Sequence, residues 1–167
     1  MSHILDFAAL GSVVGWHAID DRVMGGQSSS ILRHDAQGHA VFCGTVSLAD
    51  QGGFASVRSP LLAMTSNAEF CRLTVRGDGK RYKLSFRKDT GFDGLNFQHV
   101  FEPPAGNWVE IRLPLSAFVP GWRGRRLLAA PPGNASAIHQ LGLLIGDRQA
   151  GDFRLEIRSI AFIDPAN

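Results

Sequence analysis

The sequence predicts an all-β protein, folded as an antiparallel β-sandwich or jelly roll with one or two short helices. Apolar and polar residues alternate with a period of two in most segments after residue 40. The alternating segments recur at the spacing of a sandwich or barrel. Glycine and proline are frequent, with 19 Gly and 8 Pro in 167 residues, which favours short elements joined by tight turns. A chain of this length buries roughly 70% of its unfolded surface, so we expect one domain over residues 1–167.

The composition excludes several classes of protein. Hydrophobic residues make up 44% and charged residues 19% of the chain, which excludes disorder. The 17 Lys and Arg against 15 Asp and Glu leave a net charge of +2, so binding of nucleic acid is not expected. No apolar run is long enough to predict a transmembrane helix. The first residues lack the features of a signal or transit peptide, and we expect a cytoplasmic, bacterial-type protein with Cys43 and Cys71 as free, buried thiols.

The clearest strands are Cys71–Arg76 and Tyr82–Arg87, in which apolar and polar residues strictly alternate. The turn-rich segment Gly77–Arg81 lies between them, so we expect a hairpin. One face of this hairpin would carry the polar side chains Arg72, Thr74, Lys83, Ser85 and Arg87.

Six further segments complete a set of about eight predicted strands, and the first forty residues are less clear. The six segments are Ala40–Val46, Phe54–Ser59, Asn96–Phe101, Trp108–Leu113, Gln140–Ile145 and Phe153–Phe162. Short helices are expected near Asp6–Gly11, where Asp6 can cap, and at Pro114–Phe118, where the proline suits a first turn.

The sequence contains no complete catalytic motif. Gly26–Ser30 lacks the second glycine of a nucleophile elbow, and Gly77–Lys80 lacks the residues of a phosphate-binding loop. The six histidines show no metal-binding spacing. Asp20 and Asp21 are adjacent, so on a strand their carboxylates would point to opposite faces, although a structural calcium ion stays open. We therefore predict no enzyme activity, no cofactor and no metal site.

Two groups of aromatic and basic residues are candidates for binding. Trp122 lies beside the basic cluster Arg123–Arg126, which can grip phosphates or form a solvated loop. Trp16, Trp108 and Trp122 can form a sugar-stacking platform or fill the core and its lid. The sequence leaves both alternatives open.

A series of short motifs resembles the complex I intermediate-associated protein family. The resemblance runs through nearly the whole chain, in order. Its segments are Asp21–Ser28, Phe42–Ser47, Gly52–Arg58, Val75–Tyr82, Trp108–Pro114 with Phe118, and Gly151–Ile157. It implies a galactose-binding-like jelly roll, similar to carbohydrate-binding modules, and a chaperone-like role in the assembly of respiratory complex I. The implied partners are complex I subunits or membrane-associated assembly intermediates.

The matched motifs contain residues with a predicted structural role and others with a predicted binding role. We expect the glycines to permit bulges or close strand approach, and Met24 and Phe54 to anchor their segments in the core. The structural set is Met24, Gly25, Gly26, Ser28, Gly52, Gly53, Phe54, Gly77, Gly79 and Trp108. The candidate binding set is Arg58, Asp78, Tyr82, Trp122 and Asp21.

Arg58, Asp78 and Tyr82 admit two interpretations, because a charged residue near a core needs a partner. Arg58 and Asp78 can form an ion pair that holds a loop, or all three can grip a ligand on one sandwich face. At the level of function, a protein-binding assembly module is the first hypothesis. A module that binds a carbohydrate or another small ligand is the alternative, by analogy of fold.

Overall fold

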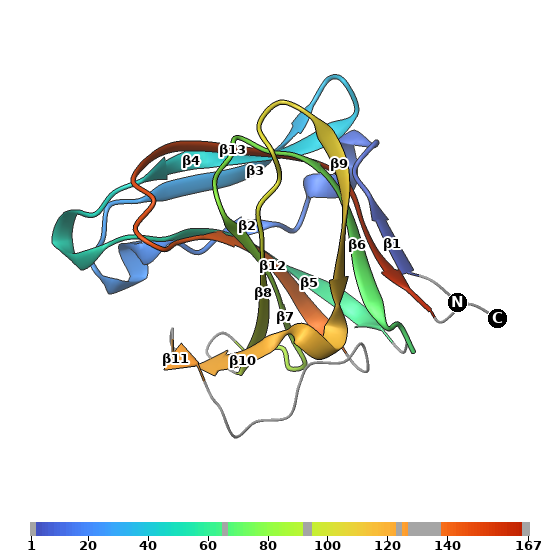
Figure 1. The fold of residues 1–167 in the computed structure, drawn as a ribbon. Helices are drawn as coiled ribbons and strands as arrows, with labels where there is room; N and C mark the ends of the chain where they lie inside the picture. Colours follow the sequence, from blue (N-terminus) through green and yellow to red (C-terminus); the bar gives the residue numbers. More distant parts are fainter. Residues whose placement is uncertain (1–2, 65–66, 92–94, 123–124, 127–137, 165–167) are drawn as a thin grey trace.

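The computed structural model describes residues 3–64, 67–91, 95–122, 125–126 and 138–164. These residues form two antiparallel sheets that pack face to face (Figure 1). Sheet A has the strand order β3-β4-β13-β6-β9, and β1 pairs with one end of β13. Its strands are β1 (His3–Asp6), β3 (Ser29–Asp35), β4 (His39–Val46), β6 (Phe70–Arg76), β9 (Trp108–Pro114) and β13 (Gly151–Ile163).

Sheet B has the order β11-β10-β8-β7-β12-β5-β2. Its strands are β2 (His17–Ala18), β5 (Ala55–Met64), β7 (Tyr82–Arg87), β8 (Asn96–Phe101), β10 (Val119–Trp122), β11 (Arg125–Arg126) and β12 (Ile138–Ile145). The sandwich predicted from the sequence is confirmed, with a strand at each of the eight predicted places. The strands that alternation did not reveal are β1, β2, β3, β10 and β11.

The helices in the described residues are short 3₁₀ turns. They are η1 (Leu10–Val13), η2 (Asp21–Met24), η3 (Ala49–Gln51) and η4 (Leu115–Ala117). The predicted helix after Pro114 is confirmed as η4, whereas the predicted N-terminal helix begins later, with Ala9 as its N-cap. Asp6 instead accepts a hydrogen bond from the amide of Ala8. No helix among the described residues is long and apolar enough to cross a membrane.

The predicted hairpin between Cys71–Arg76 and Tyr82–Arg87 is wrong. β6 belongs to sheet A and β7 to sheet B, so the segment Gly77–Arg81 carries the chain from one sheet to the other. Arg72 and Thr74 therefore lie on the outer side of sheet A, and Lys83, Ser85 and Arg87 on the outer side of sheet B. Alternation identifies a strand and its buried face, but it does not identify the neighbouring strand.

The core lies between the sheets and is rich in aromatic rings. The alternating residues Tyr82, Leu84 and Phe86 of β7 are fully buried, as the period of two requires. Tyr82 lies against Phe42 and Phe101, with ring centroids 6.2 and 6.1 Å apart. The two cysteines are free. Cys71 on β6 points into this core, whereas Cys43 on β4 is half-buried, and β13 lies between these two strands. Burial raises the pKa of the Cys71 thiol, which keeps it protonated and unreactive.

Candidate binding site on the outer face of sheet B

The outer face of sheet B is polar because every second residue of its central strands points away from the core. Arg58 on β5 pairs with Gly142 on β12, which pairs with Ser85 on β7, which pairs with Gln98 on β8. At the edge of the sheet, His17 on β2 pairs with Arg58. These directly paired residues form a row across the five strands β2, β5, β12, β7 and β8, and every residue of the row except Gly142 has a polar side chain.

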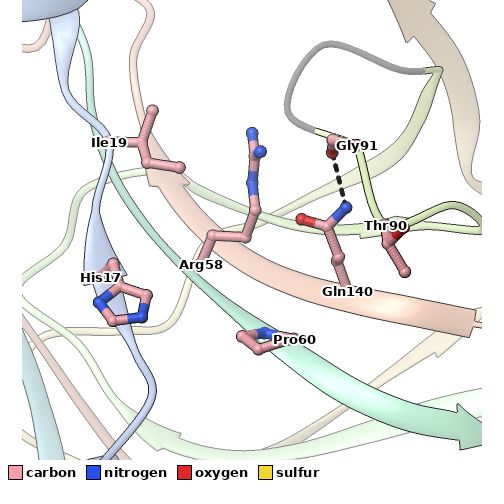
Figure 2. Close-up of a pocket in the computed structure, with 7 residues that line it drawn as sticks. All are labelled: His17, Ile19, Arg58, Pro60, Thr90, Gly91 and Gln140. Carbon is pink, nitrogen blue, oxygen red and sulfur yellow. Dashed lines mark hydrogen bonds between the residues drawn. The ribbon is translucent and has the colours of Figure 1, made fainter.

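A pocket opens on this face at the end of the row (Figure 2). Its volume is about 200 Å³. We call it the Arg58 pocket; it is lined by His17, Ile19, Arg58, Pro60, Gln140 and the turn Thr90–Gly91. The side chain of Arg58 extends between Ile19 and Gly91 (Figure 2). The rest of the lining combines the apolar Pro60 with the polar side chains of His17, Thr90 and Gln140.

Gln140 fixes the wall of the pocket opposite Arg58. Its side-chain amide donates hydrogen bonds of 2.8 Å to the carbonyl oxygens of both Asp89 and Gly91. Both amide hydrogens are therefore used to hold the turn after β7, and the carbonyl oxygen of Gln140 points toward Arg58 (Figure 2). Gln140 is buried, although it lies on the outer face. The pocket wall is thus positioned by β12, a central strand of the sheet.

The electrostatics of the pocket are dominated by arginine. Partial burial of the Arg58 guanidinium, reinforced by the nearby positive charge of Arg87, lowers the pKa of Arg58 to about 10. The carboxylate of Asp89 opposes this shift. Arg58 remains charged at neutral pH, but its charge lies in a partly desolvated site next to a like charge.

The structure does not bring the predicted trio Arg58, Asp78 and Tyr82 together. Tyr82 points into the core and is fully buried, whereas Arg58 points out of the opposite face of the same sheet. The Tyr82 hydroxyl donates a 2.9 Å hydrogen bond to the Asp78 carboxylate. Burial, and then the charge of Asp78, raise the pKa of Tyr82. Asp78 also accepts hydrogen bonds from the backbone amides of Lys80 and Arg154, so it anchors the crossing segment to the core and to β13.

Asp21 lies at the centre of a buried cluster, with 1% of the residue exposed. One carboxylate oxygen accepts the amide of Ser28, and the other accepts the Ser28 hydroxyl and the amides of Gly53 and Phe54, at 2.5 to 3.3 Å. Burial favours the neutral acid, but these hydrogen bonds outweigh it and lower the pKa of Asp21. Asp21 therefore joins η2, the start of β3 and the segment before β5.

Two predicted glycines make room for the Asp21 carboxylate. A Cβ at Gly26 would lie 2.5 Å from Asp21 Cγ, and a Cβ at Gly52 would lie 2.6 Å from its second oxygen. The sequence predicted close strand approach at these glycines, whereas the structure places the Asp21 side chain against both. Of the other predicted glycines, Gly25 caps η2, Gly53 donates to Asp21, and Gly77 and Gly79 lie in the crossing segment.

Asp20 and Asp21 have separate partners. Asp20 accepts hydrogen bonds from the amide and hydroxyl of Ser30 and from the amide of Ser56. Each carboxylate therefore links β3 to the β5 region, and the pair is not arranged around a shared ligand. Among the residues that the structure describes, no group of three or more His, Cys, Asp or Glu is placed to hold a metal ion.

The expected core role of Met24 is wrong. Met24 is 72% exposed and its neighbour Val23 is 61% exposed. Both lie in η2, whose first residue, Asp21, is buried, so that the end of η2 faces outward. Phe54 is partly buried. The apolar character of these residues predicts burial, but the hydrogen bonds of Asp21 determine which way η2 faces.

The predicted tryptophans occupy different places. Trp108 lies on the outer face of sheet A, with the guanidinium carbons of Arg76 and Arg158 at 5.0 and 4.0 Å from its ring centroid. Trp16 packs on Phe7 with centroids 6.1 Å apart. Trp122 ends β10 on sheet B, and its side chain and the segment 123–124 lie outside the described part of the chain. The described rings do not form one platform.

Sequence reasoning identified Arg58 but missed His17, Ile19, Gln140 and Thr90 as its neighbours. One signal was present for Gln140, which is polar within the apolar run Ile138–Ile145. For the others, no sequence signal places β2 and the turn after β7 beside β5.

Comparisons with known proteins give a family and a fold. The family model for complex I intermediate-associated protein 30 (CIA30) matches residues 5–157. A Caenorhabditis elegans relative, named as a probable mitochondrial complex I intermediate-associated protein 30, is 30% identical over 79% of this chain and 45% of its own length. The mitochondrial mouse protein of that name is 28% identical over 91% of this chain and 53% of its own length. The chain thus spans about half the length of these relatives.

An uncharacterised protein of Schizosaccharomyces pombe is 30% identical over 92% of this chain and 82% of its own length. The expected bacterial-type cytoplasmic location is wrong, because the worm and mouse relatives are named as mitochondrial proteins.

The fold is similar to that of carbohydrate-binding modules. A family 11 module from Clostridium thermocellum aligns with a TM-score of 0.72 at 16% identity, covering 100% of this chain and 96% of that one. The same module in complex with a β-1,3-1,4-mixed-linked tetrasaccharide aligns with a TM-score of 0.72 at 15% identity, over 99% and 97% of the two chains. At this identity the similarity establishes the jelly-roll fold and nothing about a ligand.

Proposed function

Because the chain belongs to the complex I intermediate-associated protein 30 family, we propose that it is a non-enzymatic protein-binding module that assists assembly of respiratory complex I in mitochondria. The observation that carries this proposal is the match of the family model to residues 5–157, nearly the whole domain. The names of the worm and mouse relatives support the mitochondrial setting.

The geometry supports a binding module in two ways. The family-like motifs around Asp21 and Asp78 build the scaffold through internal hydrogen bonds, rather than gathering around a reactive group. The outer face of sheet B, in contrast, offers polar side chains and a shallow pocket on rigid strands. Such a surface suits recognition of another protein, because side chains fixed by a sheet lose little entropy on binding.

The test is deletion of the gene in its own organism, followed by native gels and assays of NADH:ubiquinone oxidoreductase activity. We expect less mature complex I and an accumulation of subassemblies, with unchanged synthesis of subunits. Re-expression of the natural chain should restore the complex, and an unrelated respiratory complex serves as control. Normal levels of mature complex I after deletion would contradict the proposal.

Carbohydrate binding is the second candidate, supported by the similarity of fold to the family 11 module. The described outward residues of β5, β7, β8 and β12 include no aromatic side chain, although sugar rings commonly stack on such residues. A panel of soluble glycans should therefore leave the melting temperature unchanged. A glycan that raises it, with the rise lost in Arg58→Gln, would favour this candidate instead.

A further inference from the structure

Strand β9 is an edge strand of seven residues, and its open side has no partner strand among the residues that the structure describes. It pairs along its whole length with β6 and ends the strand order of sheet A (Figure 1). The other edges are shorter or occupied. β1, β2 and β11 have four, two and two residues, and on β3 the Ser30 amide donates to Asp20. An open edge as long as β9 is a template for another strand.

The inward-facing side chains of β9 show that the described part of the chain leaves this edge uncovered. On the neighbouring β6, the inward-facing Cys71, Leu73 and Val75 are fully buried. Val109 and Ile111 face the same way on β9 and pack against the core, but they stay partly exposed. A further strand beside β9 would cover these two side chains, and the burial of their apolar surface would stabilise the pairing.

The outward-facing side chains of β9 include one acid and one base, two positions apart. Glu110 lies 3.3 Å from Arg72 Nε on β6, and 64% of its side chain is exposed. Arg112 pairs directly with Arg72 across the two strands, so two like charges face each other. The Arg112 guanidinium carbon lies 3.9 Å from the centroid of the Phe70 ring, and no acid among the described residues is within ion-pair distance of it. Arg112 therefore lacks an acidic partner.

Antiparallel pairing of β9 with β9 of a second copy would supply this acid. In the register centred on Ile111, Glu110 lies opposite the second copy's Arg112, and two-fold symmetry makes this pair twice. The same register uses all seven residues, with Trp108 opposite Pro114. A shift by one residue would place outward-facing side chains opposite inward-facing ones. Registers centred on Glu110 or on Arg112 would set like charges opposite each other, and registers centred nearer the ends pair fewer residues.

We propose that the chain forms a symmetric dimer in which β9 of one copy pairs antiparallel with β9 of the other, centred on Ile111. The two A sheets then form one continuous sheet. On its inner side, Val109 lies opposite Leu113 and Ile111 opposite Ile111. On its outer side, the Glu110 carboxylate accepts hydrogen bonds from Arg72 of its own chain and from Arg112 of the second copy. This inference goes beyond the proposed function, because it concerns self-association and not complex I.

Sedimentation velocity over a series of concentrations measures the dimer. We expect the natural chain to approach twice the 18.1 kDa mass of one chain as its concentration rises. Glu110→Arg and Arg112→Glu each set like charges opposite each other on both sides of Ile111. Each variant alone should therefore dimerise at least about tenfold more weakly than the natural chain.

A mixture of the two variants is the decisive sample. When one Glu110→Arg chain pairs with one Arg112→Glu chain, opposite charges again face each other on both sides of Ile111. The mixture should therefore form a dimer that neither variant forms well alone. The double variant Glu110→Arg/Arg112→Glu should also dimerise, because it exchanges the two charges. The control is Arg33→Glu, an equal change of charge on β3 at the far edge of the same sheet, which should dimerise like the natural chain.

Hydrogen exchange on the natural chain gives a second readout that needs no variant. Protection of the β9 amides should rise with concentration, whereas protection of the short edge strand β2 should not. Circular dichroism checks that each variant is folded, and the exchange measurement decides the question where a variant is not.

Four results would overturn the inference. A natural chain that stays monomeric at its highest soluble concentration would leave the edge of β9 to a strand from another protein. Single variants that dimerise as strongly as the natural chain would place the interface elsewhere. A mixture that dimerises no better than its components would contradict the register centred on Ile111. Protection of β9 that does not change with concentration would show that this strand is not in the interface.

Discussion

The outer faces of the two sheets both carry arginines, but they use them differently. On sheet A, Glu156 accepts hydrogen bonds from Arg76 and Arg154 and lies 3.0 Å from the His39 ring nitrogen. Arg158 lies over the Trp108 ring. On sheet B, Arg58 projects into a pocket, near the like charge of Arg87.

The difference shows that an arginine's neighbours, rather than its place on a strand, determine its role. The hydrogen bonds from Arg76 lower the pKa of Glu156 to about 2, so on sheet A each charge stabilises the other. On sheet B, burial and Arg87 lower the pKa of Arg58 to about 10, so its charge is disfavoured there. The first arrangement stabilises the fold through paired charges, whereas the second places a charge in a partly desolvated pocket.

The largest expected effect comes from removing the acid of sheet A. Glu156→Ala leaves the buried His39 and two arginines without their shared partner. Breaking a buried pair costs roughly 3–5 kcal/mol. We expect the lower end, about 3 kcal/mol, because Arg76 and Arg154 can turn toward water. Urea denaturation followed by circular dichroism measures this loss.

The control for Glu156 is Glu110→Ala, which removes the partner of Arg72 from an exposed pair on the same sheet. Such pairs contribute about 0–1 kcal/mol. Equal losses in the two variants would show that the Glu156 cluster is no more than a surface pair.

Removal of a second buried carboxylate, that of Asp21, should give the next largest loss of stability. Asp21→Ala leaves the Ser28 hydroxyl and the amides of Ser28, Gly53 and Phe54 without their acceptor. Each buried unsatisfied group costs about 1–3 kcal/mol, and water entering the space reduces the sum, so we expect about 2–3 kcal/mol. Asp50→Ala in the neighbouring η3, whose carboxylate binds only the exposed Gln27 in the described contacts, should cost far less. A loss no larger than that of Asp50→Ala would contradict the role of Asp21.

The pH dependence of stability should also differ between the faces. The pKa of Glu156 is about 2 when folded and near its ordinary value of 4.5 when unfolded. As pH falls below 4.5, the unfolded chain takes up the proton first, so the contribution of Glu156 is complete above this pH and disappears toward pH 2. The urea midpoint of the natural chain should fall between pH 6 and 3 more steeply than that of Glu156→Gln. Parallel curves would contradict the assignment. Arg58 should add no slope in this range, because it stays charged throughout.

More of the fold than of the candidate site could be predicted from the sequence. Strict alternation located β7 to the residue and β6 to within one residue, because one face of each strand is buried. It could not tell that the segment after Arg76 crosses between sheets, because that depends on the Asp78 contacts with Tyr82 and β13. Strands of two to four residues, such as β2, are too short to show a period.

The candidate site was harder to predict because its residues come from β2, β5, β12 and the turn after β7, which are distant in sequence. The family-like motifs directed attention to Asp21, Asp78 and Tyr82, and the structure places these in the scaffold. The motif Gly52–Arg58 also directed attention to Arg58, because a charged residue near a core needs a partner. Its neighbours, Gln140 above all, became visible only when the sheet order was known.

The smallest expected change in stability is the one that separates the two faces most directly. Arg58→Gln removes a partly desolvated charge that Arg87 disfavours, so we expect the free energy of unfolding to change by less than about 1 kcal/mol, in either direction. Arg76→Gln on sheet A removes the main partner of Glu156 and should cost more. Both variants are compared by urea denaturation at pH 7. If Arg58→Gln destabilises the fold as much as Arg76→Gln does, Arg58 holds the sandwich together like the arginines of sheet A, and the pocket is a by-product of that role.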